Sequence, residues 1–312
     1  TGNAIISKRY LIYSREELVK NTYPVKKEDI LKLVSDYDQF IDNTSIANPN
    51  TIEALRSKAM LYAFYLDRYD SAESILRNII AMPRVNPSLR LQSKIDLGDI
   101  YILLDEPWES SLLYAQVEKE ADDAPLGYEA KLKSAKLYYY MGDFSLASDL
   151  LDILKDATSR EIANDAMALN LLIKDNSKMD TTDVPLKRYA GIDLLIFQNR
   201  FDQAMDSLVI LANNYPNHSL QDEILFTQSE INMKTGKFSL AAENLEKIIL
   251  KHKKGILADD ALYNLANLYY TYLDDEDKAQ ELYQNLLVDF PGSIYVQDAR
   301  KKFRKLRGDM IN

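Results

Sequence analysis

The chain has 312 residues, of which 46% are hydrophobic and 28% are charged, and its net charge is −10. This composition is that of a folded chain and excludes a largely disordered one, while the negative charge argues against nucleic acid as a general partner. The apolar runs span only a few residues, so we predict no transmembrane segment, and the lack of cysteine excludes disulfides, thiolate metal sites and cysteine nucleophiles.

The N-terminal part comes before any regular repeat. Residues 1–25 have an ambiguous pattern, and one interpretation is the remnant of an upstream repeat. Neither an initial Met nor a charged and then apolar leader precedes Tyr10, so we expect a processed or trimmed chain whose targeting signal, if any, is missing. The next predicted element is a single helix over residues 26–42, which follows Pro24 and is closed by the turn around Pro49.

From residue 52 onward, short turns separate amphipathic helices at a regular interval. A small residue follows each turn at the same offset, at Ala72, Ser110, Ala147, Ala204, Ala241 and Ala279. The successive spacings are 38, 37, 57, 37 and 38 residues. A small side chain is needed where the second helix of a pair comes close to the first, and large apolar residues four and seven positions later extend the same helix face. The period predicts antiparallel helix pairs.

These offsets resemble those of the tetratricopeptide repeat (TPR) family from residue 52 to the end. The best local matches are Leu97-Gly98 with Tyr101, and residues 262–269 with Ala279, Tyr283 and Pro291. The chain departs from the family in its longer period, and Ser159 and Lys253 stand where two repeats should end in proline. The resemblance implies an all-α fold, a right-handed α-solenoid of TPR-like helix pairs.

The interval of 57 residues is about 20 residues longer than one period. We predict that the surplus is one added helix over residues 159–175, followed by a polar linker over residues 176–183. An odd helix disturbs the alternation of the array, so we expect a kink or hinge here; a surface insertion without functional motion is the alternative. The predicted organisation is an N-terminal segment (1–25), an N-terminal TPR block (26–158), the inserted helix and linker (159–183), and a C-terminal TPR block with a basic capping helix (184–312).

The sequence offers no convergent set of reactive groups. Motifs for phosphate-binding loops, serine nucleophile elbows and zinc-protease helices are missing. His218 and His252 lie 34 residues apart without a third ligand at the same spacing, and the acidic run at residues 274–277 lacks the glycine and distal Glu of a calcium loop. We therefore predict no enzyme activity, no cofactor and no metal site.

Aromatic residues are abundant, with 21 Tyr and 9 Phe. In a TPR solenoid the first helix of each pair lines a concave groove, and the resemblance assigns to it Phe64, Tyr65, Tyr139, Tyr140, Tyr189, Phe197, Phe226, Tyr263, Asn267 and Tyr270. Such rings suit a protein-binding surface, although they could instead pack between neighbouring helices. The basic clamp with which some family members bind acidic tails is missing, so we expect an extended or helical, partly apolar ligand.

The last predicted helix is strongly basic, with Arg300, Lys301, Lys302, Arg304, Lys305 and Arg307. Basic residues near a helix C-terminus complement the helix dipole, and a terminal repeat needs a polar cap. The alternative is docking to an acidic partner or to lipid headgroups, which leaves peripheral membrane association open.

The function follows from these patterns and from one further resemblance. Residues 290–295 and 215–219 are similar to periplasmic TPR proteins of outer-membrane protein assembly and the Tol-Pal system, which implies a periplasmic or outer-membrane location; the cytoplasm is the alternative. The first hypothesis is a non-enzymatic scaffold that binds a protein or peptide segment in the tyrosine-rich groove. The alternatives are a structural subunit that uses helix edges and end caps, and a regulatory domain of a larger chain. The oligomeric state stays open.

Overall fold

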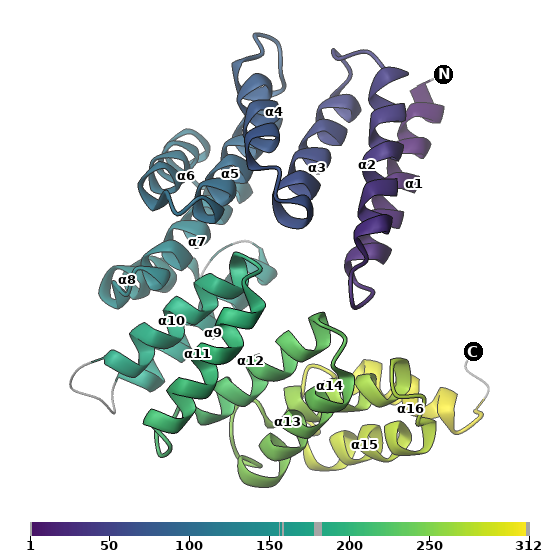
Figure 1. The fold of residues 1–312 in the computed structure, drawn as a ribbon, viewed down its shortest axis with the longest axis vertical. Coiled ribbons are helices and arrows are strands. Elements are labelled where there is room, and N and C mark those ends of the chain that lie inside the picture. The colour runs from purple at the N-terminus through teal and green to yellow at the C-terminus, as the bar shows by residue number, and fades with distance from the viewer. Residues whose placement is uncertain (1, 156, 158, 178–182, 310–312) are drawn as a thin grey trace. The chain divides into compact units, whose positions relative to one another are not determined.

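The computed structural model describes residues 2–155, 157, 159–177 and 183–309. Across these residues it contains sixteen α-helices and no β-strand (Figure 1). The all-α prediction is confirmed. The chain forms two compact units, one of residues 1–204 and one of residues 205–312.

The N-terminal unit is an array of helices that pack in chain order. Its helices are α1 (Gly2–Lys20), α2 (Lys27–Asp42), α3 (Pro49–Leu66), α4 (Tyr69–Ala81), α5 (Pro87–Leu103), α6 (Pro107–Ala121), α7 (Pro125–Tyr140), α8 (Phe144–Leu154), α9 (Arg160–Ser177) and α10 (Val184–Phe197). Each helix from α1 to α9 contacts the next one. The first helices of successive pairs, α1, α3, α5 and α7, also contact their neighbours in that order. This is the packing of stacked helix pairs.

Proline and asparagine mark the starts of α3 and α5. Pro49 and Pro87 stand at the first helical position, where a missing N–H removes no helix hydrogen bond. Asn48 and Asn86 precede them and each accept a hydrogen bond from the backbone N–H two residues further on, at 3.0 and 2.8 Å. Both helices therefore begin at points fixed by the sequence, on the same edge of the unit (Figure 1).

The small residues of the repeat lie in the core. All six are fully buried, namely Ala72, Ser110, Ala147, Ala204, Ala241 and Ala279. Between α5 and α6, the Oγ of Ser110 donates a hydrogen bond to the carbonyl oxygen of Gly98 at 2.7 Å. A Cβ on Gly98 would lie 2.4 Å from the ring of Tyr114, so only glycine fits there without displacing the ring.

The inserted helix is present as α9, and its bounds agree with the predicted residues 159–175 to within two residues. It packs against α8 and also contacts α7, so it continues the array. Residues 178–182 of the predicted linker lie outside the described residues. The hinge at this point stays a prediction.

The boundary between the two units differs from the predicted start of the C-terminal block at residue 184. The N-terminal unit extends to Ala204 and includes α10. The reason is packing, because α10 contacts α7 and α9, and its Leu194 and Phe197 lie against a buried core cluster of α5, α6 and α7.

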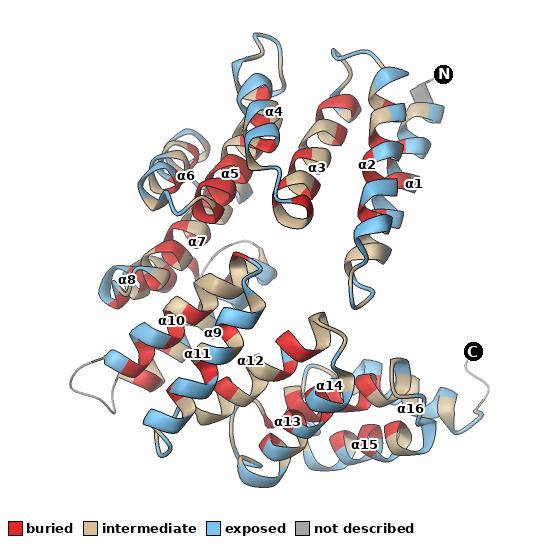
Figure 2. Cartoon of the chain, in the orientation of Figure 1, coloured by how far each residue is buried: buried red, intermediate tan, exposed pale blue. Residues whose placement is uncertain are grey.

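The C-terminal unit repeats the same packing. Its helices are α11 (Phe201–Asn214), which begins in the N-terminal unit, α12 (Gln221–Lys234), α13 (Phe238–Lys251), α14 (Ala258–Thr271), α15 (Glu276–Asp289) and α16 (Val296–Leu306). From α12 to α16 each helix contacts the next. The core includes Leu245, Leu265 and Leu286, and Figure 2 shows buried residues along the facing sides of these helices.

Some large apolar side chains remain exposed. Helix α1 contacts α2 and α3, so the ambiguous residues 1–25 contain a helix that pairs with α2. It leaves Tyr10 and Leu18 largely exposed, and Trp108 at the start of α6 is 73% exposed. Among the described residues, none of the helices has both the length and the apolar character to cross a bilayer.

Candidate functional site

The ten predicted groove residues fall into two groups. Six lie in the N-terminal unit, on α3, α7 and α10, and four lie in the C-terminal unit, on α12 and α14. In the N-terminal unit the end of α10 contacts several of the groove residues on the other helices. In the C-terminal unit α16 does so. We describe the two contacts as the N-terminal closure and the C-terminal closure.

The N-terminal closure is the end of α10 lying on α3, α5 and α7. The ring of Phe197 meets Phe64 edge to face with 5.6 Å between ring centroids, and it lies 6.1 Å from the ring of Tyr140. Leu194 and Phe197 also pack against the core formed by Ile102 and its neighbours. Three of the predicted residues are thus brought together, but as a packed cluster.

The turn after α10 adds hydrogen bonds to this closure. The Nε2 of Gln198 donates to the carbonyl oxygen of Ile102 at 2.9 Å and to Oδ1 of Asp105 at 2.7 Å. The Nδ2 of Asn199 donates to the carbonyl oxygen of Phe64 at 2.8 Å. Both carbonyls lie in the last turn of a helix, where the ordinary N–H partner four residues on is missing; that of Ile102 also accepts from the backbone N–H of Asp105 at 3.3 Å. The side-chain amides therefore cap the C-terminal ends of α3 and α5.

Two more predicted residues lie inside the unit. Tyr139 is buried and its hydroxyl donates a hydrogen bond to Oδ2 of Asp193 on α10 at 2.7 Å. Burial, together with the Asp193 carboxylate, raises the pKa of Tyr139 well above its usual range. Tyr189 is buried as well. These two rings are part of the core and cannot meet a partner directly.

Tyr65 lies apart from this cluster. It packs against the core that α1, α2 and α3 share, and burial raises its pKa to about 12. The structure therefore does not bring Tyr65 together with Phe64 and Tyr140 at the end of α10.

A buried charge network connects α3, α5, α6 and α7. The Nε of Arg56 donates to Asp96 at 2.7 Å, while Asp99 accepts from the hydroxyl of Tyr114 and from the Nζ of Lys133, both at 2.7 Å. Burial raises the pKa of Asp96 to about 6, against the attraction of Arg56. Sequence reasoning missed this network; its one signal is two aspartates three residues apart in an otherwise apolar stretch of α5.

The C-terminal closure is α16, with the residue before it, lying on α14. Tyr263 stacks on Tyr295 with 4.2 Å between ring centroids, and its hydroxyl donates to Oδ2 of Asp298 at 2.5 Å. The Nζ of Lys302 donates to Oδ1 of Asn267 at 2.6 Å, and the Nζ of Lys305 donates to the hydroxyl of Tyr270 at 2.8 Å. The predicted groove and the predicted basic patch are therefore in contact with each other in this unit.

The other basic residues point elsewhere. Arg300 and Lys301 are exposed, and Arg304 and Arg307 form ion pairs with Asp309 at 3.5 and 2.5 Å. The six residues are thus not one uniform patch. The remaining groove residue, Phe226 on α12, packs at the edge of the C-terminal core.

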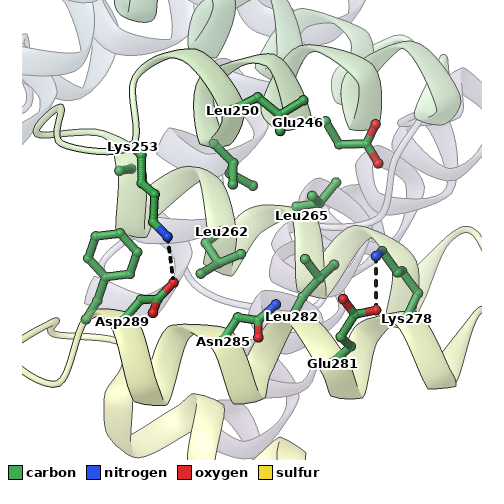
Figure 3. Close-up of a pocket in the computed structure, with 13 residues that line it drawn as sticks. Glu246, Leu250, Lys253, Leu262, Leu265, Lys278, Glu281, Leu282, Asn285 and Asp289 are labelled. Atoms are coloured by element: carbon green, nitrogen blue, oxygen red, sulfur yellow. Dashed lines mark hydrogen bonds and ion pairs between the residues drawn. The ribbon is translucent and has the colours of Figure 1, made fainter.

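A cleft between α13 and α15 was missed by sequence reasoning. It has a volume of about 450 Å³, its floor includes Leu262 and Leu265, and Leu250 stands on its wall (Figure 3). Ion pairs lie at two sides, Lys253 with Asp289 at 3.3 Å and Lys278 with Glu281 at 3.0 Å. Such a surface can take apolar side chains. Its sequence signal is the apolar run of residues 248–250. Only the first of these three apolar residues is buried in the core, so the run extends beyond the buried face of α13.

The described residues contain no group of three or more His, Asp or Glu placed to hold a metal ion. The carboxylates of the closures are instead bonded to tyrosines, amides and lysines. These contacts link neighbouring helices.

Comparison with known proteins agrees with the repeat. Residues 260–293, which include most of α14 and all of α15, match the family model of the tetratricopeptide repeat. No curated protein matches the chain.

Among solved structures, a tetratricopeptide repeat protein from Parabacteroides merdae is 12% identical, with 95% of this chain and 99% of that chain covered and a TM-score of 0.36. The C-terminal part of a TPR repeat-containing protein from Cytophaga hutchinsonii is 17% identical, with 92% and 98% covered and a TM-score of 0.34. Likeness at this level carries no argument about function.

Proposed function

We propose that the chain is a non-enzymatic protein–protein interaction scaffold that holds a partner segment on the aromatic inner surfaces of its helix pairs. The N-terminal closure is the observation that carries this proposal. There α3, α5 and α7 accommodate the end of a helix through one aromatic anchor, Phe197, and two side-chain amides. Aromatic anchors beside hydrogen bonds are typical of binding hot spots. The partly buried rings of Tyr140 and Tyr270 are the proposed points of contact.

A crosslinking pull-down from the native source tests this proposal. It compares the unchanged chain with the double variant Tyr140→Ala, Tyr270→Ala and with the control Tyr10→Ala, which removes an exposed ring from α1. We expect partners to be lost from the double variant alone. Retention of every partner by the double variant would refute the proposal. Tyr139 is unsuitable for this test because it is buried and bonded to Asp193.

A structural subunit of a larger stable complex is the second candidate. It is favoured by apolar side chains outside the inner surfaces, such as Leu250 on the wall of the cleft between α13 and α15 and Val288 on α15, both mostly exposed. The variant Leu250→Asp would lose partners in this case, while Tyr140→Ala, Tyr270→Ala would keep them. The same pull-down therefore separates the two candidates.

A regulatory TPR domain of a larger chain is a third candidate, and the sequence upstream of Thr1 in the native source tests it. We also propose a location in the bacterial cell envelope, periplasmic or outer-membrane associated. The support is the resemblance of residues 290–295 and 215–219 to periplasmic TPR proteins. Fractionation of the native source with an antibody to the chain tests the location, and recovery in the cytosolic fraction would overturn it.

A further inference from the structure

A second surface lies at the edge of the N-terminal unit where α3 and α5 begin. The turn between α2 and α3 and the turn between α4 and α5 line a cleft of about 540 Å³. We call it the edge cleft; its larger apolar side chains are Ile46, Ile52, Met82, Val85 and Leu89. It lies at the N-terminal ends of α3 and α5, whereas the N-terminal closure contacts their C-terminal ends.

Two arginines accompany the edge cleft. Arg84 belongs to its lining and is exposed. Arg90 donates from Nη2 to the carbonyl oxygen of Met82, a lining residue, at 2.9 Å, while its Nε is buried without a hydrogen-bond partner. Within the described part of the chain, neither guanidinium forms an ion pair with a carboxylate. In a protein with 48 acidic side chains, the exposed Arg84 guanidinium in the lining is therefore available to an anion.

The backbone adds to the positive charge at this edge. Helices α3 and α5 both begin here, and neither has an acidic residue in its first turn. The partial positive charge at each helix N-terminus is therefore not offset by a side chain of its own first turn. The first acidic residue of α3 is Glu53, beyond that turn. An apolar surface with positive flanks results, on a chain whose net charge is −10.

We propose that the edge cleft binds an acidic amphipathic segment of a partner protein, one that combines apolar side chains with carboxylates. The apolar wall removes the partner's apolar side chains from water, and Arg84 pairs with a carboxylate through its planar guanidinium. This inference goes beyond the proposed function and does not depend on it, because the edge cleft lies at the N-terminal ends of α3 and α5, away from Tyr140 and Tyr270.

Fluorescence anisotropy with the full chain tests the edge cleft. The probe is a fluorescein-labelled peptide, Glu-Leu-Asp-Leu-Phe-Glu-Leu-Asp, and its control has Gln and Asn in place of the acids. We expect the acidic peptide to bind and the amide peptide to bind about tenfold more weakly, as the loss of hydrogen bonds to charged groups implies. Arg84→Glu should weaken binding by a similar factor. Arg160→Glu, an exposed arginine on α9, should leave it within about twofold.

A second variant keeps the test independent of folding. Ile46 is half exposed in the lining of the cleft, so Ile46→Ser should leave the circular dichroism spectrum unchanged. It should weaken binding of the acidic peptide by about threefold. Equal binding of the acidic and amide peptides, or equal effects of Arg84→Glu and Arg160→Glu, would overturn the proposal. So would Arg84-dependent binding to phosphatidylglycerol vesicles without peptide binding, or Arg84-dependent self-association in sedimentation. These outcomes assign the cleft to a membrane surface or to a second copy.

Discussion

The N-terminal and C-terminal closures cover their inner surfaces with different chemistry. In the first, Phe197 and two neutral amides meet aromatic rings and backbone carbonyls. In the second, Lys302 and Lys305 meet an amide oxygen and a phenol hydroxyl, with Asp298 beside them. Salt screens charged groups near the surface but has little effect on neutral buried contacts. The inner surfaces of similar helix pairs can therefore be covered either by a largely neutral, partly buried contact or by a contact between charged and polar side chains.

Acidification is expected to act on the two regions with opposite sign. Burial raises the pKa of Asp96 to about 6, so its charged form destabilises the fold, and stability is gained as the pH falls from 7 toward 4. The gain is roughly 3 kcal/mol for a shift of about two pKa units. Urea unfolding at several pH values, followed by circular dichroism, measures it. The variant Asp96→Asn should remove most of this dependence, and an unchanged pH profile would contradict the assignment.

In the C-terminal closure, protonation of Asp298 on acidification is expected to lower the stability. Burial alone would raise the pKa of its carboxyl, but hydrogen bonds from Lys302 and Tyr263 hold it below the usual value. Its contribution to stability is therefore lost as the pH falls through this lowered pKa. Amide hydrogen exchange at pH 7 and pH 3, corrected for intrinsic rates, should show α16 losing protection. The variant Asp298→Asn should lose less protection on acidification.

Removal of the aromatic anchor should distinguish the closures at neutral pH. Phe197→Ala is expected to cost about 2 kcal/mol, less than a fully buried Phe because the ring is half-buried. Phe303→Ala on α16, also half-buried, is the matched change. It should cost less, because its ring packs against one core cluster whereas that of Phe197 packs against two. Urea unfolding measures both, and equal losses would mean that the two closures have the same character.

Gln198→Ala removes one buried and one partly buried hydrogen bond from the N-terminal closure. We expect a loss of about 1 kcal/mol, equal at 50 mM and 500 mM NaCl because the donor is neutral. The same urea titration at both salt concentrations checks it. A loss that shrinks strongly with salt would show that the pairing with Asp105 dominates over that with the carbonyl of Ile102.

The smallest effect is expected for Lys302→Met in the C-terminal closure. It removes the contacts to Asn267 and Asp298 and should cost about 0.5 kcal/mol at low salt. Unlike the loss from Gln198→Ala, this loss should fall toward zero at 500 mM NaCl. A constant loss would mean that the contacts of the Lys302 ammonium with the rings of Tyr263 and Tyr283 matter more than its exposed ion pair with Asp298.

Much of the fold could be predicted from the sequence because the repeat is encoded locally. The small residues and the inserted helix follow from the repeat spacing; the former are buried as expected, and the latter lies within two residues of its predicted bounds. The place of α10 could not be predicted in this way. Its contacts depend on Gln198 and Asn199, two turn residues that bond to helix ends more than 90 residues away in the chain.

The candidate site shows the same limit. The register places residues on the first helix of a pair, but it does not show whether another helix covers them. Tyr139 and Tyr189 fit the groove positions and are buried in the core. The contact of Lys302 with Asn267 spans 35 residues, close to one period, so a search for charged partners one repeat apart offers a signal for such closures.

Trp108 is the chain's single tryptophan, and its indole stands mostly in water at the first turn of α6. Its fluorescence should change little on unfolding, because the ring is nearly as hydrated in the folded chain as in the unfolded one. A molecule that binds to this part of α6 would exclude water from the indole ring and shift its emission to shorter wavelength. The emission of Trp108 therefore reports binding at this surface and is nearly insensitive to unfolding.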